Sequence, residues 1–339
     1  ARERVASILG ADTSEIVFTS CGTESNNYAI HCSLEAHPDK KHVITTKVEH
    51  PAVLNVCKYF GKNGYDVTEL NVNKDGMLDQ DELRDSIRDD TAIVSIMHAN
   101  NETGVIFPIE EIAKIVKEKG VLFHCDAVQA IGKIPVNLKN SNIDLLSMSG
   151  HKLHAPKGVG VLFIRKGVRI DPLIIGGHQE DNRRSGTENV PYIIGLGKAC
   201  EIAEGFVKQE QTEVRRLRDR LEKGIKDQLT HVAISGENSE RLPNTSNVSF
   251  EYVEGEATLL LLDMAGIATS SGSACTTGSA EPSHVLQAMG IPPVTSRGTI
   301  RFSLSRYSTE DDVDYILEKL VPIVKRLQSL SPLFDDSQT

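Results

Sequence analysis

The fold is decided by residues 91–126, which read TAIVSIMHANNETGVIFPIEEIAKIVKEKGVLFHCD. Two short runs rich in β-branched residues, 91–98 and 121–126, enclose a segment that Pro108 precedes and Gly120 ends. Within that segment the apolar residues follow helical spacing, namely Ile109, Ile112, Ala113 and Val116. A proline at the start and a glycine at the end are typical of a helix. Strand, helix and strand in this order predict a βαβ unit of a parallel sheet.

The same alternation of strand-like runs and helical patterns extends over the N-terminal part of the chain, with further runs at 15–19, 42–48, 143–148 and 158–164. The C-terminal part differs. It shows a long charged helix at 201–229, a strand at 245–250, a helix at 256–264, a Ser/Gly-rich loop at 269–282, and a last strand and helix. We therefore expect an α/β protein with a large, mostly parallel-sheet domain over 1–205 and a smaller α+β domain over 206–339.

The composition excludes several classes of protein. The chain has 339 residues with 37 Lys and Arg against 47 Asp and Glu, a net charge of −10, which argues against a nucleic-acid or anionic-membrane partner. Apolar runs fall short of the roughly 20 residues that a membrane helix needs, and residues 1–5 show no signal region, so we expect a cytoplasmic protein. The six cysteines form no CxxC pair, so reduced thiols and no metal site are expected.

Four polar clusters follow predicted strands, at residues 21–25, 50–51, 100–102 and 124–126. In open α/β sheets, ligands bind beyond the carboxyl ends of the strands, so the four clusters together predict one site. Gly22 and Thr23, at a strand-to-helix turn, would offer backbone N–H groups to a phosphate. A plain helix N-cap is the alternative interpretation of that turn.

Lys152 directly follows a strand, within the stretch SGHKLHAPKGVG at residues 149–160. An amine at that place would form a Schiff base if it were kept partly desolvated. Asp126, at another strand end, would keep a pyridine nitrogen protonated so that the ring draws electrons. Taken singly, a solvated surface lysine and a capping or salt-bridging aspartate remain the alternatives.

Several motifs together resemble the NifS/IscS cysteine desulfurases, with the NifS branch the nearer. The motifs are Gly22–Asn27, Glu49–Val53, Asn100–Gly104, His124–Gln129, His151–Lys152, Arg184–Asn189 and Ser271–Cys275. They occur in the same order, and the resemblance covers residues 1–332. It implies the aminotransferase-like fold of enzymes that use pyridoxal 5′-phosphate (PLP), known as fold type I, class V.

The resemblance assigns PLP contacts to individual residues. Lys152 would carry PLP through its amine, Asp126 would pair with the pyridine nitrogen, Gln129 would contact the phenolic oxygen, and His50 would stack on the ring. The phosphate would be held by neutral or cationic donors, as a dianion requires. These donors are Gly22, Thr23, Ser149, His151 and Thr187 of the partner subunit.

The substrate contacts implied by the resemblance lie elsewhere in the chain. Asn101 and Arg301 would hold the carboxylate of L-cysteine. Arg301 alternates with Ile300 and Phe302 in the last predicted strand, so it faces away from the apolar side, and a guanidinium binds a carboxylate bidentately. Cys275 would attack the substrate sulfur from a loop, 269–282, that we expect to be mobile because it has no large apolar side chain.

The implied reaction converts L-cysteine to L-alanine and leaves a persulfide on Cys275. The sulfur would then pass to an iron–sulfur scaffold or another acceptor protein, in general cluster supply or in nitrogenase maturation. A transient iron–sulfur species on Cys275 is the one metal contact that the resemblance allows. The phosphate contact from Thr187 of the partner subunit implies a homodimer with shared active sites.

Other functions stay open at this point. An aminotransferase, a selenocysteine lyase or a sulfinate desulfinase would also need Lys152 and Asp126; Cys275 argues against the first but not against the selenocysteine lyase. A thiol hydrolase built on Cys275 and His284 would leave Lys152 unexplained. Compared with the family, the chain begins inside a helical pattern, without an Asn-Asn-Ala-Thr segment, so we expect a fragment. This keeps a non-catalytic sulfur-relay scaffold among the alternatives.

Overall fold

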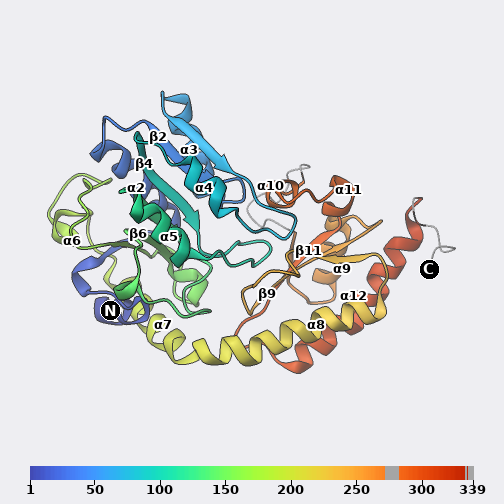
Figure 1. Ribbon diagram of the computed structural model, residues 1–339. Coiled ribbons are helices and arrows are strands. Elements are labelled where there is room, and N and C mark those ends of the chain that lie inside the picture. The colour runs from blue at the N-terminus through green and yellow to red at the C-terminus, as the bar shows by residue number, and fades with distance from the viewer. Residues whose placement is uncertain (272–281, 333, 335–339) are drawn as a thin grey trace. The chain divides into compact units, whose positions relative to one another are not determined.

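The computed structural model describes residues 1–271, 282–332 and 334, and the chain forms two compact units (Figure 1). Unit 1 comprises Ala1–Asn71, Leu78–Asn100 and Phe107–Val207, and unit 2 comprises Val72–Met77, Asn101–Ile106 and the chain from Lys208 onward. Two short segments numbered below 205 thus pack with the C-terminal part of the chain. Each unit has its own sheet and its own apolar core.

Unit 1 is built on a seven-stranded sheet in the order β1-β7-β6-β5-β4-β2-β3. The strands from β6 to β3 run parallel to their neighbours, whereas β7 pairs antiparallel with both β6 and β1. The strands are β1 (Ile16–Thr19), β2 (His42–Thr46), β3 (Asp66–Leu70), β4 (Thr91–Met97), β5 (Leu122–Asp126), β6 (Leu145–Ser149) and β7 (Gly160–Ile164).

Helices cover this sheet because each buries one apolar face. The helix α5 (Ile109–Glu118) buries its isoleucines together with Ala113 and Val116, and it carries Glu110 and Glu111 in its first turn, where the helix dipole favours acidic residues. The helix α2 (Gly22–Ala36) packs on β4 to β7 and against α3 (Pro51–Lys62). The other helices are α1 (Arg2–Leu9), α4 (Gln80–Ser86), the turn α6 (Gln179–Asn182), and α7 (Val190–Gln209), which runs into unit 2.

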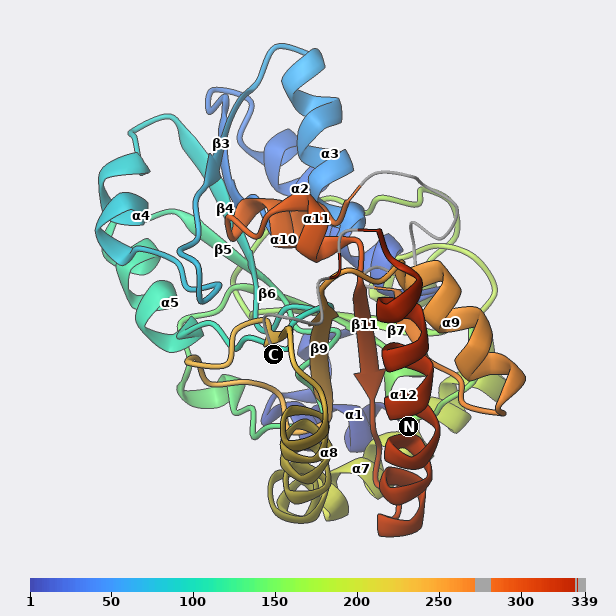
Figure 2. The same ribbon diagram turned by 90° about the vertical axis from the view of Figure 1, so that its right-hand side faces the viewer.

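Unit 2 contains a four-stranded antiparallel sheet in the order β10-β11-β9-β8. Figure 2 shows its two inner strands, β9 and β11, side by side. Its strands are β8 (Val232–Ile234), β9 (Thr245–Phe250), β10 (Ser270–Ser271) and β11 (Thr299–Ser303). Val248, Phe250, Ile300 and Phe302 share one core with apolar side chains of the helices. The helices are α8 (Arg215–Gln228), α9 (Gly255–Met264), α10 (His284–Ala288), α11 (Pro293–Ser296) and α12 (Glu310–Leu330).

The expectation of an α/β fold with a large, mostly parallel sheet is confirmed. The strand predicted at 245–250 has those bounds in the structure. The long charged helix differs from expectation, because α7 begins at Val190 and a π-helical turn, Glu210–Val214, separates it from α8. In the described part of the chain, no helix is long and apolar enough to cross a membrane.

Candidate active site

The carboxyl ends of β4, β5 and β6 form a polar edge of the sheet in unit 1. The strand register places Met97 beside Asp126 and Asp126 beside Ser147, so the ends of the three strands are neighbours. Lys152 lies in the short 3-10 turn Gly150–Leu153 that directly follows β6. The fold therefore brings the predicted lysine and the predicted aspartate to one edge of one sheet.

Asp126 is a buried carboxylate, 6% exposed, whose two described hydrogen bonds come from neutral donors. Asn26 donates from Nδ2 to Oδ2 at 2.7 Å, and the Val128 backbone N–H donates to Oδ1 at 3.0 Å. Burial raises the pKa of Asp126, and the two hydrogen bonds and the charges of His50 and Lys152 oppose that rise. A positively charged ligand group beside Asp126 would remove the cost of burying its charge.

His124 supports this edge from inside the sheet. It lies on β5, fully buried, and its Nδ1 and Nε2 are 2.8 Å and 2.9 Å from the hydroxyls of Ser95 and Ser147 on the flanking strands. Burial lowers the pKa of His124 to about 3, so the ring is neutral at physiological pH. His124 belongs to one of the polar clusters predicted to form the site, but its contacts with Ser95 and Ser147 were not predicted. The signal in the sequence was a histidine within an otherwise apolar strand.

The turn that carries Lys152 is closed by backbone hydrogen bonds. Gly150 N donates to Val159 O at 3.0 Å, and Ala155 N donates to Gly150 O at 3.1 Å. The carbonyl of Lys152 accepts a hydrogen bond from Nζ of Lys133 at 3.2 Å. A Cβ atom on Gly150 would lie only 3.0 Å from Val159 O, so any larger residue there would force neighbouring atoms to shift. The backbone of Lys152 is thus fixed before any ligand binds.

The N-terminus of α2 lies next to Ser149 and has the features that anion binding needs. Its N-cap, Cys21, makes no side-chain capping hydrogen bond, so the N–H groups of the first turn face outward from the helix end. A Cβ atom on Gly22 would lie 2.8 Å from Cγ2 of Val128 and 3.4 Å from Cβ of Ser149. Glycine therefore keeps open the space between Ser149 and the first turn of α2, where Thr23 follows.

A basic residue offsets the one acidic side chain of that turn. Arg184 donates from Nε and Nη2 to the carboxylate of Glu24 at 2.9 Å and 3.2 Å. Burial raises the pKa of Glu24, but the hydrogen bonds from Arg184 and Ser20 outweigh it and leave the pKa below its ordinary value. Glu24 thus remains ionised and paired, and its charge opposes anion binding less than that of a lone carboxylate.

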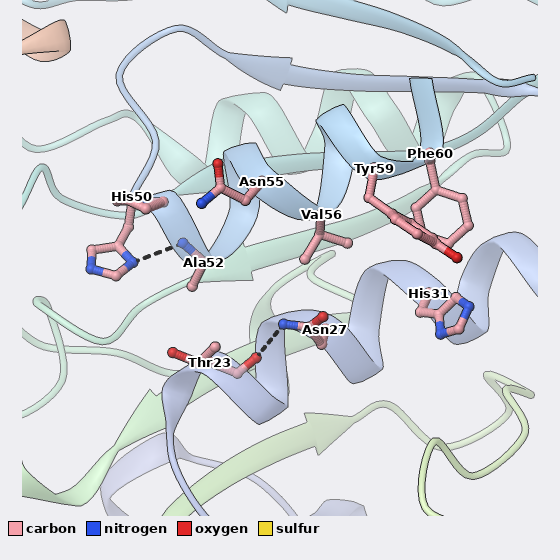
Figure 3. Close-up of a pocket in the computed structure, with 10 residues that line it drawn as sticks. Thr23, Asn27, His31, His50, Ala52, Asn55, Val56, Tyr59 and Phe60 are labelled. Atoms are coloured by element: carbon pink, nitrogen blue, oxygen red, sulfur yellow. Dashed lines mark hydrogen bonds between the residues drawn. The ribbon is translucent and has the colours of Figure 1, made fainter. Parts of the chain in front are cut away.

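His50 and Thr23 line one cavity of about 590 Å³ between α2 and α3 (Figure 3). Figure 3 shows His50 at the start of α3, where its Nδ1 accepts a hydrogen bond from the Ala52 N–H at 3.1 Å. Because Nδ1 is an acceptor, the ring proton of neutral His50 sits on Nε2. Other residues of the two helices also line the cavity, among them Asn27, Asn55 and Tyr59.

The phosphate candidate His151 follows Ser149 in the same turn as Lys152. Partial burial lowers the pKa of His151, and the positive charges of Lys152 and Lys157 lower it further. Gln129 lies half-buried in the turn after β5. Thr187 lines a different, smaller hollow of about 210 Å³ with Arg184 and Glu180 of its own chain.

The two predicted substrate residues contact each other in unit 2. Nη1 of Arg301 donates to the backbone carbonyl of Asn101 at 2.8 Å, and Nη2 donates to Oγ of Ser270 at 3.4 Å. Ile300 and Phe302 are buried on β11 while Arg301 is partly exposed, as the alternation predicted. Cys275, the predicted sulfur acceptor, lies outside the described residues.

Known proteins with similar sequences and structures cover nearly the whole chain. Residues 1–316 match the aminotransferase class-V family. A cysteine desulfurase of Nostoc sp. is 59% identical over 336 residues, 99% of this chain and 84% of the relative, and the cysteine desulfurase NifS of Azotobacter vinelandii is 56% identical over 333 residues, 98% of this chain and 83% of the relative. A solved NifS-like protein superposes with a TM-score of 0.90 at 43% identity, covering 96% of this chain and 86% of that one.

Proposed function

Because the chain belongs to the class-V aminotransferase family and, within it, to the cysteine desulfurases, we propose that it takes the sulfur from L-cysteine and releases L-alanine. The observation that carries the proposal is the sheet edge of unit 1, where a lysine on a fixed turn, a buried aspartate and an uncapped helix N-terminus come from neighbouring elements. These three groups answer the three needs of PLP: an amine, a counter-charge for its ring nitrogen and a phosphate site.

The residues fit PLP on physical grounds. The space that Gly22 keeps open lies against Ser149 at the N-terminus of α2, which suits a phosphate. Asp126 is buried with neutral hydrogen-bond donors, which suits a protonated pyridine nitrogen. We assign Gly22, Thr23, Ser149 and His151 to the phosphate, Gln129 to the phenolic oxygen and His50 to the ring face. When bound, PLP supplies an electron sink that stabilises negative charge on the substrate Cα.

The chain's own groups then move protons and position the substrate. We assign to Nζ of Lys152 the proton transfer at the substrate Cα, since it is the amine on the fixed turn. His50 keeps Nδ1 as an acceptor from Ala52, which leaves its Nε2–H as a donor. Arg301 and Asn101 would bind the substrate carboxylate, because the guanidinium offers paired donors.

The sulfur step is assigned to Cys275. Its thiolate would form a bond to the sulfur of the substrate while the carbon–sulfur bond breaks, and protonation of the released carbon gives L-alanine. The product on the chain is a Cys275 persulfide. Its two sulfurs together are oxidised by two electrons relative to the two thiols, and the substrate carbon, which exchanges its bond to sulfur for a bond to hydrogen, is reduced by two electrons. Only the thiolate is a good nucleophile, so this step needs a proton acceptor in the site.

We propose a homodimer in which Thr187 of the partner subunit completes the phosphate site. Support comes from exposed apolar side chains that lie on either side of Thr187 in the sequence of unit 1: Ile175 is 87% exposed, Ile194 57%, Val190 54% and Tyr192 43%. Exposed apolar side chains gathered in one segment are typical of a protein interface. A monomeric sedimentation profile at full cofactor occupancy would count against the dimer.

For the sulfur acceptor we propose a protein that assembles iron–sulfur clusters, as expected of a chain in this family. The test is transfer of ³⁵S from L-[³⁵S]cysteine to an apo scaffold protein bearing free thiols. Label that stays on Cys275 in the presence of the scaffold, yet leaves with dithiothreitol, would argue for a different acceptor.

Visible absorption tests the cofactor and substrate classes together. The purified chain is incubated with PLP, desalted and titrated with L-cysteine. We expect a retained chromophore that changes on adding L-cysteine, and its loss in Lys152→Ala, since the amine that holds PLP is gone. Lys166→Ala, an exposed lysine beyond β7, is the matched control and should keep the chromophore.

Cys275→Ser separates substrate binding from sulfur removal. This variant should still bind PLP and L-cysteine but form no persulfide and release no sulfide when a thiol reductant is present. Sulfide and alanine production at the wild-type rate in Cys275→Ser would show that the thiol is not the sulfur acceptor.

A further inference from the structure

Glu102 lies in the segment 101–106, which belongs to unit 2 and is held within it by backbone hydrogen bonds. Leu242 N donates to Gly104 O at 2.7 Å, and Ile106 N donates to Glu240 O at 2.9 Å. Gly104 has a φ of 79°, and a Cβ atom there would lie 3.0 Å from Cβ of Thr245. The conformation of this segment is therefore set by unit 2, although it follows β4 of unit 1 in the sequence.

The side chain of Glu102 is fully buried and is connected to the start of α10. Oγ of Ser283 donates to Oε2 of Glu102 at 2.5 Å. The same hydroxyl accepts from the N–H groups of Val285 and Leu286 at 3.2 Å and 3.3 Å, as the N-cap of α10. The Ser283 hydroxyl uses its one proton for Glu102 and its lone pairs for the N–H groups of α10. It therefore holds the Glu102 carboxyl in a single orientation.

Glu102 also lies within electrostatic reach of Arg301. Burial raises the pKa of Glu102, while the Ser283 hydrogen bond and the positive charges of His284 and Arg301 lower it. The guanidinium of Arg301 donates to the carbonyl of Asn101, the residue directly before Glu102. One buried carboxyl is thus hydrogen-bonded to the start of α10, and the guanidinium assigned to the substrate is hydrogen-bonded to the residue next to it and acts on its charge.

We propose that Glu102 is a positioning residue for substrate binding: together with the Asn101 carbonyl it holds the Arg301 guanidinium in the orientation that receives the substrate carboxylate. The role rests on the proposed function, because that function assigns Arg301 to the carboxylate. An arginine side chain has large rotamer entropy, so a guanidinium that is already ordered loses less on binding. Ser283 contributes by fixing the carboxyl that orders Arg301.

Two probes separate this role from a general structural one. L-Alanine, the product, carries the amine and the carboxylate but no sulfur, so its binding does not depend on Cys275. Ethylamine is the same amine without the carboxylate. Both are titrated into the PLP-loaded chain and followed by visible absorption, which gives two dissociation constants for each variant.

Glu102→Ala should weaken L-alanine binding about tenfold, the loss expected for one charge-assisted contact, and raise KM for L-cysteine by the same factor. Ethylamine binding and PLP occupancy should stay within twofold of wild type. Glu102→Gln, which keeps an acceptor for Ser283 and is nearly isosteric, should weaken L-alanine binding about threefold and carries the test if Glu102→Ala does not fold. Equal losses for L-alanine and ethylamine would overturn the proposal, since only the carboxylate contact runs through Arg301.

A double-mutant cycle with Arg301→Ala checks that the two residues act as one. In the Arg301→Ala background, Glu102→Ala should change L-alanine binding less than twofold, because the group it orders is absent. Independent, multiplicative losses would overturn the proposal. If the PLP-loaded wild type gives no response to L-alanine, the proposed function itself fails, and this role of Glu102 fails with it; a wild-type response that Glu102→Ala and Glu102→Gln leave unchanged contradicts the role of Glu102 alone.

Discussion

Two carboxylates, Glu222 in unit 2 and Asp126 in unit 1, are buried to nearly the same extent, 7% and 6% exposed, and differ in how their charge is balanced. Nη1 and Nη2 of Arg241 donate to Glu222 at 2.7 Å and 2.9 Å. Burial raises the pKa of Glu222, but the Arg241 contact outweighs it and leaves the pKa below its ordinary value. For Asp126 the burial effect dominates, and the pKa is raised.

The difference separates a structural carboxylate from a binding one. The Glu222–Arg241 pair is complete within the protein, so it needs no ligand and contributes to the fold of unit 2. Asp126 is held in place by Asn26 and Val128, which orient its oxygens without neutralising them. A buried acid with an incomplete charge balance at a sheet edge is a candidate ligand for a cation, and the protonated ring of PLP is such a cation.

The largest effect on activity is expected when Asp126, whose charge the protein balances only in part, is made neutral. Asp126→Asn should reduce kcat roughly 1,000-fold at saturating PLP, because an amide does not stabilise a protonated ring nitrogen and the loss is of the size seen for preorganised electrostatic groups. Steady-state alanine production measures it. Asp144→Asn is the matched control: Asp144 is also buried beside the sheet, 3% exposed, and accepts from the Phe123 N–H at 3.0 Å before β6. A wild-type kcat in Asp126→Asn would show that the charge of Asp126 is not needed for the reaction, and Asp126 would then be a structural carboxylate like Glu222.

Breaking the Glu222–Arg241 pair should lower the stability of unit 2 and leave the activity nearly unchanged. Glu222→Gln leaves the Arg241 charge buried and unpaired, so we expect about 3 kcal/mol lower unfolding free energy for unit 2, with kcat within twofold of wild type. Denaturant titration of the PLP-free chain checks the first value and the alanine assay the second. Glu213→Gln, from an exposed pair with Arg216, should leave the unfolding midpoint unchanged. A large fall in kcat with unchanged stability would reverse the assignment of roles.

A third buried carboxyl, Glu49, differs from Glu222 and Asp126 in the pH dependence that it gives to stability. Its Oε1 accepts from the Thr46 hydroxyl at 2.8 Å and from the Met97 N–H at 3.0 Å, and burial raises its pKa from an ordinary 4.5 to about 8. Between these two values the folded chain holds a proton that the unfolded chain has lost. Stability therefore falls as pH rises, by about 1.4 kcal/mol per pH unit from this group.

Glu49→Gln is the test of that slope, since an amide keeps the acceptor and does not titrate. Unfolding free energies of the PLP-free chain at pH 5.5, 6.5 and 7.5 should fall more steeply with pH in wild type than in Glu49→Gln. Parallel pH profiles would mean that Glu49 is ionised in the folded chain. It would then resemble Glu222 rather than Asp126.

The regular elements could be predicted from the sequence where burial repeats along the chain. The strands β4, β5 and β9 are buried runs. The alternation of Ile300, Arg301 and Phe302 correctly predicted which side chains of β11 are buried. The strand β3 was not predicted because its residues, Asp66–Leu70, are mostly polar and only its last one is buried. An edge strand is defined by its partner, here β2, and not by a buried pattern of its own.

The residues of the candidate site, like the strands, could be predicted only where the local sequence carries a signal. Asp126 and Lys152 could be proposed because each follows a strand, a local signal that the rule for α/β sheets makes meaningful. The contact from Asn26 to Asp126 spans 100 residues of sequence, and the contact from Arg301 to the Asn101 carbonyl spans 200. Such pairs arise only when the sheet is assembled, so their geometry has no local signature in the sequence.

The smallest effect is expected for substitutions of buried thiols, which carry no charge that needs a partner. The thiols of Cys32, Cys57 and Cys200 are buried, and burial raises the pKa of each to about 12, so they stay protonated and unreactive at neutral pH. Cys200→Ala should keep kcat within twofold of wild type and cost about 1 kcal/mol of unfolding free energy for the lost packing. The native chain should react with a thiol reagent such as DTNB at Cys275 and Cys21 but not at these three until denaturant is added. Rapid labelling of Cys200 in the native chain would show that burial alone does not keep a group inert. The argument from Asp126, which also takes burial to shift the pKa of a titratable group, would then lose support.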